Sequence, residues 1–173
     1  SAALSALLPS VPAGVRVSVG CACGVDGAVA SFFAASPSLL VFRVGSGRFG
    51  VGRSSFARRS SRCVLSVAAG SRGLLVALPS VPVCPVGVRP SRSFFGAGSG
   101  SWGSVAFALG RRRRVLLWLP AGFFPPVWSG VSWSVGAVAW AGSVGGGGGC
   151  WWLGVAVHQT KRCKPVPAQL SLF

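Results

Sequence analysis

Apolar runs alternate with turns rich in glycine, serine and arginine along the first 120 residues of the chain. Four runs rich in Val and Leu have the length and continuity of buried strands, and they lie at 15–19, 39–44, 73–78 and 113–120. Segments with helix-like spacing of apolar residues lie at 1–10, 26–35, 52–70 and 96–110. Because continuously apolar strands that alternate with helices form covered parallel sheets, this order predicts an α/β fold with helices on both faces of a parallel sheet.

The pattern changes after residue 120. Residues 121–157 are dominated by Trp, Gly and Val, and apolar segments on both sides of the glycine run 145–149 predict a hairpin in an otherwise irregular segment. From residue 158 onward the chain is polar and contains proline, which is typical of a mobile tail. We therefore divide the chain into a domain at 1–120, a Trp/Gly-rich segment at 121–157 and a tail at 158–173.

The charge balance is strongly basic, with seventeen Lys and Arg residues, a single acid, Asp26, and a net charge of +16. Such a surface is typical of proteins that bind nucleic acid or an anionic membrane. Up to Val157, however, almost every residue belongs to ten types that can be encoded without adenine. Mutational bias therefore competes with selection as the source of the charge. Asp26 departs from that bias, which indicates that its carboxylate is needed.

Acid–base chemistry has few candidates in this sequence, because it contains one His, one Asp and no Glu. These residues cannot assemble a paired-carboxylate or triad mechanism, so we expect a binding protein rather than an enzyme. The six cysteines lack zinc-site spacing and indicate buried free thiols in a cytoplasmic protein, without metal or cofactor. The longest apolar candidate, 131–144, is too short to span a membrane, so no membrane association is expected.

Two glycine-rich loops stand between a predicted strand and a predicted helix. In the first, "SVGCACGVDGAV", Gly20 ends the strand and Gly24 precedes Asp26, which is placed to cap the helix. The second is "GAGSGSWGS", which contains Gly98, Ser99, Gly100 and Ser101. Loops of this kind present backbone N–H groups to phosphates at one edge of a sheet. In a chain with 26 glycines, both loops are equally compatible with plain turns.

Taken in order, these motifs resemble the SLOG superfamily of Rossmann-like domains, and within it the DNA-processing protein A (DprA) family. The resemblance covers residues 15–120, with Cys23 where the family has Arg and Ser60 where it has Asn. It also implies that the family's N-terminal strand would precede Ser1. The matching positions are Gly20, Ala22, Gly24 and Asp26 in the first loop, Phe56 and Arg59 in the next helix, and Ser99, Gly100 and Ser101 in the second loop.

The resemblance implies a site that binds a nucleotide or single-stranded nucleic acid. The N–H groups of Gly24 and of 98–101 would hold a phosphate, and Arg59 would contact it through its guanidinium. Asp26 would bind the loop amides or a ribose hydroxyl. The simpler alternatives are a helix-capping role for Asp26 and a solvated charge for Arg59. The glutamate required by hydrolase members of the superfamily is absent.

Three functions remain open from the sequence. The leading hypothesis is a non-enzymatic accessory protein of DNA processing or recombination. The alternatives are a nucleotide-sensing domain and a degenerate reading frame without function. The run Arg111 to Arg114 fits either a solvated turn or a contact with a nucleic-acid backbone.

The last five residues, "QLSLF", resemble the peptide by which bacterial DNA polymerases and repair proteins dock on the sliding clamp. Leu170, Leu172 and Phe173 would fill apolar pockets, and the Gln169 amide would fix the register. The alternative is a tail that packs against its own domain.

Overall fold

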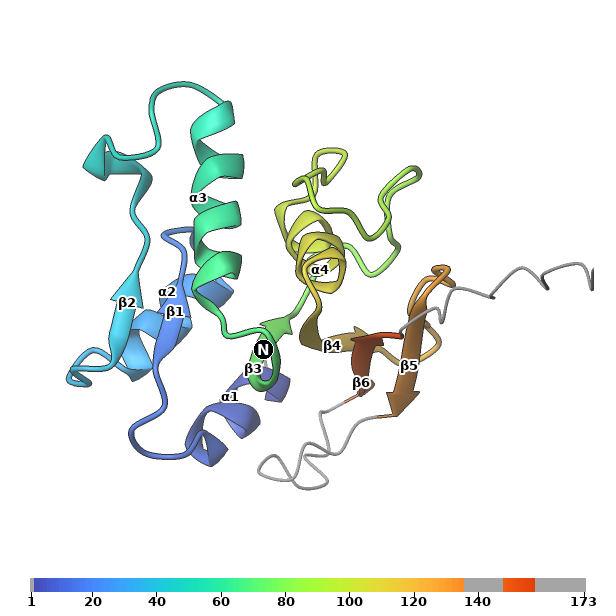
Figure 1. Ribbon diagram of the computed structural model, residues 1–173. Coiled ribbons are helices and arrows are strands. Elements are labelled where there is room, and N and C mark those ends of the chain that lie inside the picture. Colours follow the sequence, from blue (N-terminus) through green and yellow to red (C-terminus); the bar gives the residue numbers. More distant parts are fainter. Residues whose placement is uncertain (1, 136–147, 158–173) are drawn as a thin grey trace, which may run out of the picture.

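The computed structural model describes residues 2–135 and 148–157, and it has an α/β architecture (Figure 1). The sequence predicted this class. In chain order, its elements are α1 (Ala2–Leu7), the 3₁₀ turn η1 (Leu8–Ser10), β1 (Val17–Val19), α2 (Val25–Phe32), β2 (Leu39–Val41), the 3₁₀ turn η2 (Val44–Ser46), α3 (Ser54–Ser66), β3 (Gly70–Ala77), α4 (Gly100–Gly110), β4 (Arg113–Pro120), β5 (Val131–Val135) and β6 (Gly149–Ala156).

Two strand–helix–strand units with parallel strands form the body of the fold. In the first unit, β1 and β2 pair in parallel and are connected through α2. In the second, β3 and β4 pair in parallel and are connected through α4. Parallel strands joined through a helix are the basic unit of Rossmann-like folds, with which this architecture is consistent.

The larger sheet has the strand order β3-β4-β6-β5, and helices cover both of its faces. On β4, Val115, Leu117 and Leu119 pack in the same cluster as the buried residues of α4. The alternate residue Leu116 packs in a second cluster with residues of α1 such as Leu7. Because side chains alternate across a strand, one strand supplies both cores.

Two features of the sheets were not predicted. The pair β1–β2 forms a separate sheet instead of joining the larger one. Beyond residue 120, β6 pairs antiparallel with both β4 and β5, so the predicted hairpin extends the larger sheet. The helix α3 lies between the β1–α2–β2 unit and the β3–α4–β4 unit, and it contacts β1 of the first and α4 of the second (Figure 1).

No helix in the described ranges is long and apolar enough to span a bilayer.

Candidate functional site

The first glycine loop connects β1 to α2. Gly24 is the N-cap residue of α2, with a φ of 85°, in the left-handed region that favours glycine. Asp26 lies in the first helical turn, and α2 has no side-chain cap hydrogen bond. The Oδ2 atom of Asp26 instead accepts a hydrogen bond from the backbone N–H of Ala22, at 3.2 Å. The prediction that Asp26 caps the helix is therefore wrong, but the predicted contact with a loop amide is present.

Arg59 comes from the middle of α3 and meets Asp26 at this loop. Its Nη1 donates to Oδ2 of Asp26 at 3.1 Å, and the two side chains are 10% and 28% exposed. Gly20, which is buried at the end of β1, lies directly against this ion pair. A Cβ at Gly20 would overlap the Arg59 guanidinium and the Asp26 carboxylate. The close approach thus requires glycine at this position.

These contacts bear on the predicted phosphate site. The Asp26 carboxylate already binds the Arg59 guanidinium, which the prediction assigned to a phosphate, and it also binds the loop amide of Ala22. Arg59 is buried, so it is not the solvated charge that was considered as an alternative. Its Nε has no hydrogen-bond partner in the described structure. The geometry therefore favours a structural role for the ion pair over direct phosphate binding.

The thiol of Cys63 lies one helical turn after Arg59. Burial and, to a smaller extent, the charge of Asp26 raise its pKa, Arg59 opposes the increase, and the resulting pKa is about 11. The thiol is therefore protonated at neutral pH. The described cysteines are free, as expected, but the prediction of burial is wrong for three of them, because Cys21, Cys23 and Cys150 are exposed.

The second glycine loop forms the N-terminus of α4. Ser99 is the N-cap residue, and its hydroxyl accepts a hydrogen bond from the N–H of Trp102 at 3.3 Å. The carbonyl of Gly100 accepts a hydrogen bond from Ser104 within the helix. Gly98 adopts a φ of 88°, and Ser101 is the second residue of the helix. Within the described ranges, no hydrogen bond joins this loop to Asp26 or Arg59. Of the residues predicted to form the phosphate site, the structure brings Gly20, Asp26 and Arg59 into direct contact.

The arginine run between α4 and β4 is used inside the fold, and the sequence did not reveal this role. Arg113 donates from Nε to the carbonyl of Val67 at 2.7 Å and from Nη2 to that of Leu65 at 3.1 Å. Both carbonyls lie at the C-terminus of α3, where a cation is favourable. Arg114 bonds the carbonyl of Ser71, and the Arg111 guanidinium lies 5.3 Å from the ring centre of Phe107. These three side chains therefore do not form a solvated turn.

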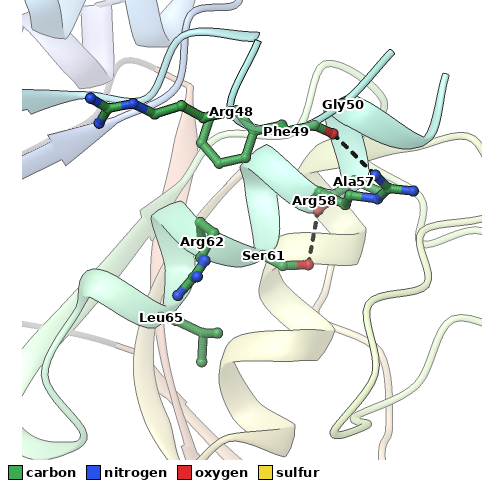
Figure 2. A pocket seen from close by; sticks show the side chains of 8 residues that line it. All are labelled: Arg48, Phe49, Gly50, Ala57, Arg58, Ser61, Arg62 and Leu65. Carbon is green, nitrogen blue, oxygen red and sulfur yellow. Dashed lines mark hydrogen bonds between the residues drawn. The ribbon is translucent and has the colours of Figure 1, made fainter. Parts of the chain in front are cut away.

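A basic hollow lies on the outer side of α3 (Figure 2). We call it the α3 groove, and its volume is about 440 Å³. The side chain of Arg58 is turned towards the turn after η2, where its Nη1 lies 3.4 Å from the carbonyl oxygen of Phe49. Arg48, Arg58 and Arg62 are exposed, and Phe49 is half-buried. The groove is lined by Arg48, Phe49, Gly50, Ala57, Arg58, Ser61, Arg62 and Leu65.

Sequence reasoning missed this groove, although part of its signal was present. Arg58, Arg62 and Leu65 are spaced by four and three residues in a segment predicted to be helical, which places them on one face. The position of Arg48 and Phe49 opposite that face depends on the path of the chain after η2. Tertiary structure therefore completes the groove.

Comparison with protein-family models, curated proteins and solved structures finds no match for this chain. In the described ranges, no cluster of three or more His, Cys, Asp or Glu side chains is arranged to hold a metal ion. The predicted clamp-binding residues Gln169, Leu170, Leu172 and Phe173 lie outside the described residues.

Proposed function

We propose that the protein is a non-enzymatic binder of single-stranded nucleic acid, in the manner of an accessory factor of DNA processing. The observation that carries this proposal is that the single acidic side chain, Asp26, is already paired inside the fold. Asp26 is bound to Arg59, so exposed arginines such as Arg48, Arg58 and Arg62 have no side-chain carboxylate to pair with. A polyanion supplies the missing negative charges, and a nucleic-acid backbone presents them at regular spacing.

Two aspects of the Asp26 site support binding over catalysis and over nucleotide sensing. A carboxylate that accepts hydrogen bonds from both Ala22 and Arg59 is held in place and is a poor general base. The same carboxylate engages the Arg59 guanidinium, which a nucleotide phosphate at this loop would need. The cationic surface outside this loop is therefore the better candidate for ligand contact.

The test is a titration of a fluorescently labelled oligonucleotide with the full chain at several salt concentrations. We expect tight binding at about 50 mM salt and a linear fall of log K with log salt concentration, because bound cations are released from the phosphates. Absence of binding at low salt would contradict the proposed function. Binding that does not change with salt would also contradict it, because the attraction would not be electrostatic.

We also propose that the C-terminal tail docks on a bacterial sliding clamp. The support is the match of all five positions in 169–173 to the clamp-binding pattern. A clamp-bound accessory protein would be brought to the DNA on which the basic surface acts. The two proposals are independent, because one depends on surface arginines and the other on the last five residues.

A further inference from the structure

The α3 groove combines positive charge with an aromatic surface. We propose that it binds one unpaired nucleotide of a single strand, with a phosphate on Arg58 and Arg62 and the base on the ring of Phe49. This inference rests on the proposed function and names the site at which it is carried out. The groove is lined by residues of α3 and of the turn after η2, and neither glycine loop nor Arg59 is among them.

Two exposed arginines of the groove start from neighbouring positions on one face of α3, so one phosphate between them is within reach of both side chains. Arg58 and Arg62 are four residues apart on α3, so their side chains start about 6 Å from each other on one face. Arg48 comes from the turn that borders the groove, and its guanidinium points away from those of Arg58 and Arg62 (Figure 2). Planar guanidinium groups bind phosphate oxygens in pairs, and these exposed side chains are free of carboxylate partners.

The apolar part of the groove accounts for the preference for an unpaired base. The Phe49 ring packs against Phe42, with 6.4 Å between the ring centres, and the carbonyl of Phe49 accepts a hydrogen bond from Arg58. A fixed, half-buried ring is suited to stacking against a base. Leu65 adds an apolar contact at the other end of the groove. In a duplex the faces of the bases are already stacked, so this contact is available only to a single strand.

The experiment compares two pairs of arginine substitutions in the full chain. The groove pair is Arg58→Ala with Arg62→Ala, and the control pair is Arg89→Ala with Arg92→Ala, which removes the same charge at two exposed positions. Affinity for a labelled single-stranded oligonucleotide is measured against salt. We expect the groove pair to lose at least about tenfold in affinity and to reduce the salt slope by about 2. The control pair should lose no more than about twofold.

A third variant, Phe49→Leu, tests stacking and keeps an apolar side chain against Phe42. We expect the wild-type chain to prefer single-stranded over duplex oligonucleotide by about tenfold, and Phe49→Leu to lose most of that preference. A thermal melt shows whether each variant is folded before its affinity is interpreted.

The outcomes separate this inference from the proposed function. Equal losses in the groove and control pairs would overturn the groove while leaving general nucleic-acid binding in place. A wild-type chain that binds duplex as tightly as single strand would overturn the stacking contact. Absence of oligonucleotide binding by the wild-type chain at low salt would overturn both.

Discussion

Asp26 and Arg59 are 33 residues apart in the sequence, and their side chains are joined by a contact of 3.1 Å between Oδ2 and Nη1. The pair connects the loop after β1 to the middle of α3. It also uses the only acidic side chain of a chain with a net charge of +16. One interaction therefore helps to fix the fold and uses the only side-chain carboxylate, so exposed arginines such as Arg48, Arg58 and Arg62 have no carboxylate partner.

Replacement of Asp26 by Ala should strongly destabilise the protein. The change leaves the Arg59 guanidinium buried without a countercharge, and we expect a loss of about 3 kcal/mol in the free energy of unfolding. Chemical denaturation measures this loss. The double variant Asp26→Ala with Arg59→Leu should recover much of it, because no unpaired charge remains. A single variant as stable as the wild type would show that the pair contributes nothing.

Gly20→Ala should displace the same ion pair without removing either charge. The added methyl group overlaps both side chains, so they must move. We expect a cost of about 2 kcal/mol, as for other overpacked sites. Gly45→Ala is the matched control, because a Cβ there meets no atom within 4 Å. Equal melting temperatures for the two variants would mean that the ion pair adapts freely to the added group.

Arg113→Ala should weaken the junction between α3 and β4. It removes two hydrogen bonds to carbonyls at the C-terminus of α3, and a cost of about 2 kcal/mol is expected. Arg72→Ala, at an exposed position of β3, removes the same charge and should be nearly neutral. Thermal unfolding compares the two. If the two variants lower the melting temperature by the same amount, the loss of a positive charge, and not the loss of the hydrogen bonds to α3, explains the decrease.

The stability of the fold should decrease at alkaline pH. The pKa values of Cys63 and Cys84 are raised by burial from 9.0 to about 11. The unfolded thiols ionise first, so this stability is complete below about pH 9 and is lost as the pH rises towards 11. The chain has no tyrosine, whose ionisation would add its own dependence of stability on pH in this range. The variant Cys63→Ala with Cys84→Ala should show a smaller loss of stability between pH 9 and pH 11. An unchanged loss would mean that groups other than these two thiols cause it.

Leu172→Ala with Phe173→Ala should abolish capture of the chain by a bacterial sliding clamp in a pull-down. These side chains are the ones that would enter apolar pockets, and aromatic and aliphatic anchors dominate such interfaces. Ser171→Ala, between Leu170 and Leu172, is the control and should retain binding. Equal retention of the double variant would reject the clamp hypothesis.

The elements of the fold could largely be predicted, because their signals are local. The run 113–120 is apolar enough to be a strand in any context, and β4 has these bounds. The separation of β1–β2 from the larger sheet was not predictable in the same way. Periodicity identifies a strand but not its neighbour, and pairing depends on how whole units pack.

The candidate site was harder to predict than the elements. Glycine loops were found from their spacing, but the partner of Asp26 is 33 residues away and spacing says nothing about it. From the sequence, Arg59 was assigned to a phosphate or to solvent, and Arg113 to a solvated turn or a nucleic-acid backbone, since arginine is usually exposed. Burial of Arg59 against Gly20 and the position of Arg113 beside the end of α3 are tertiary facts.

Because β1 and β2 form a separate sheet, the β1–α2–β2 unit should open locally more easily than the unit built on the larger sheet. From residue 9 to residue 63, Val19 is the only buried hydrophobic side chain, whereas seven residues of α4 and four of β4 are buried. Amide protons of β1, α2 and β2 should therefore exchange with solvent while those of β4 remain protected. Opening of this part would separate the loop that carries Asp26 from α3, so it should also expose the Arg59 side chain.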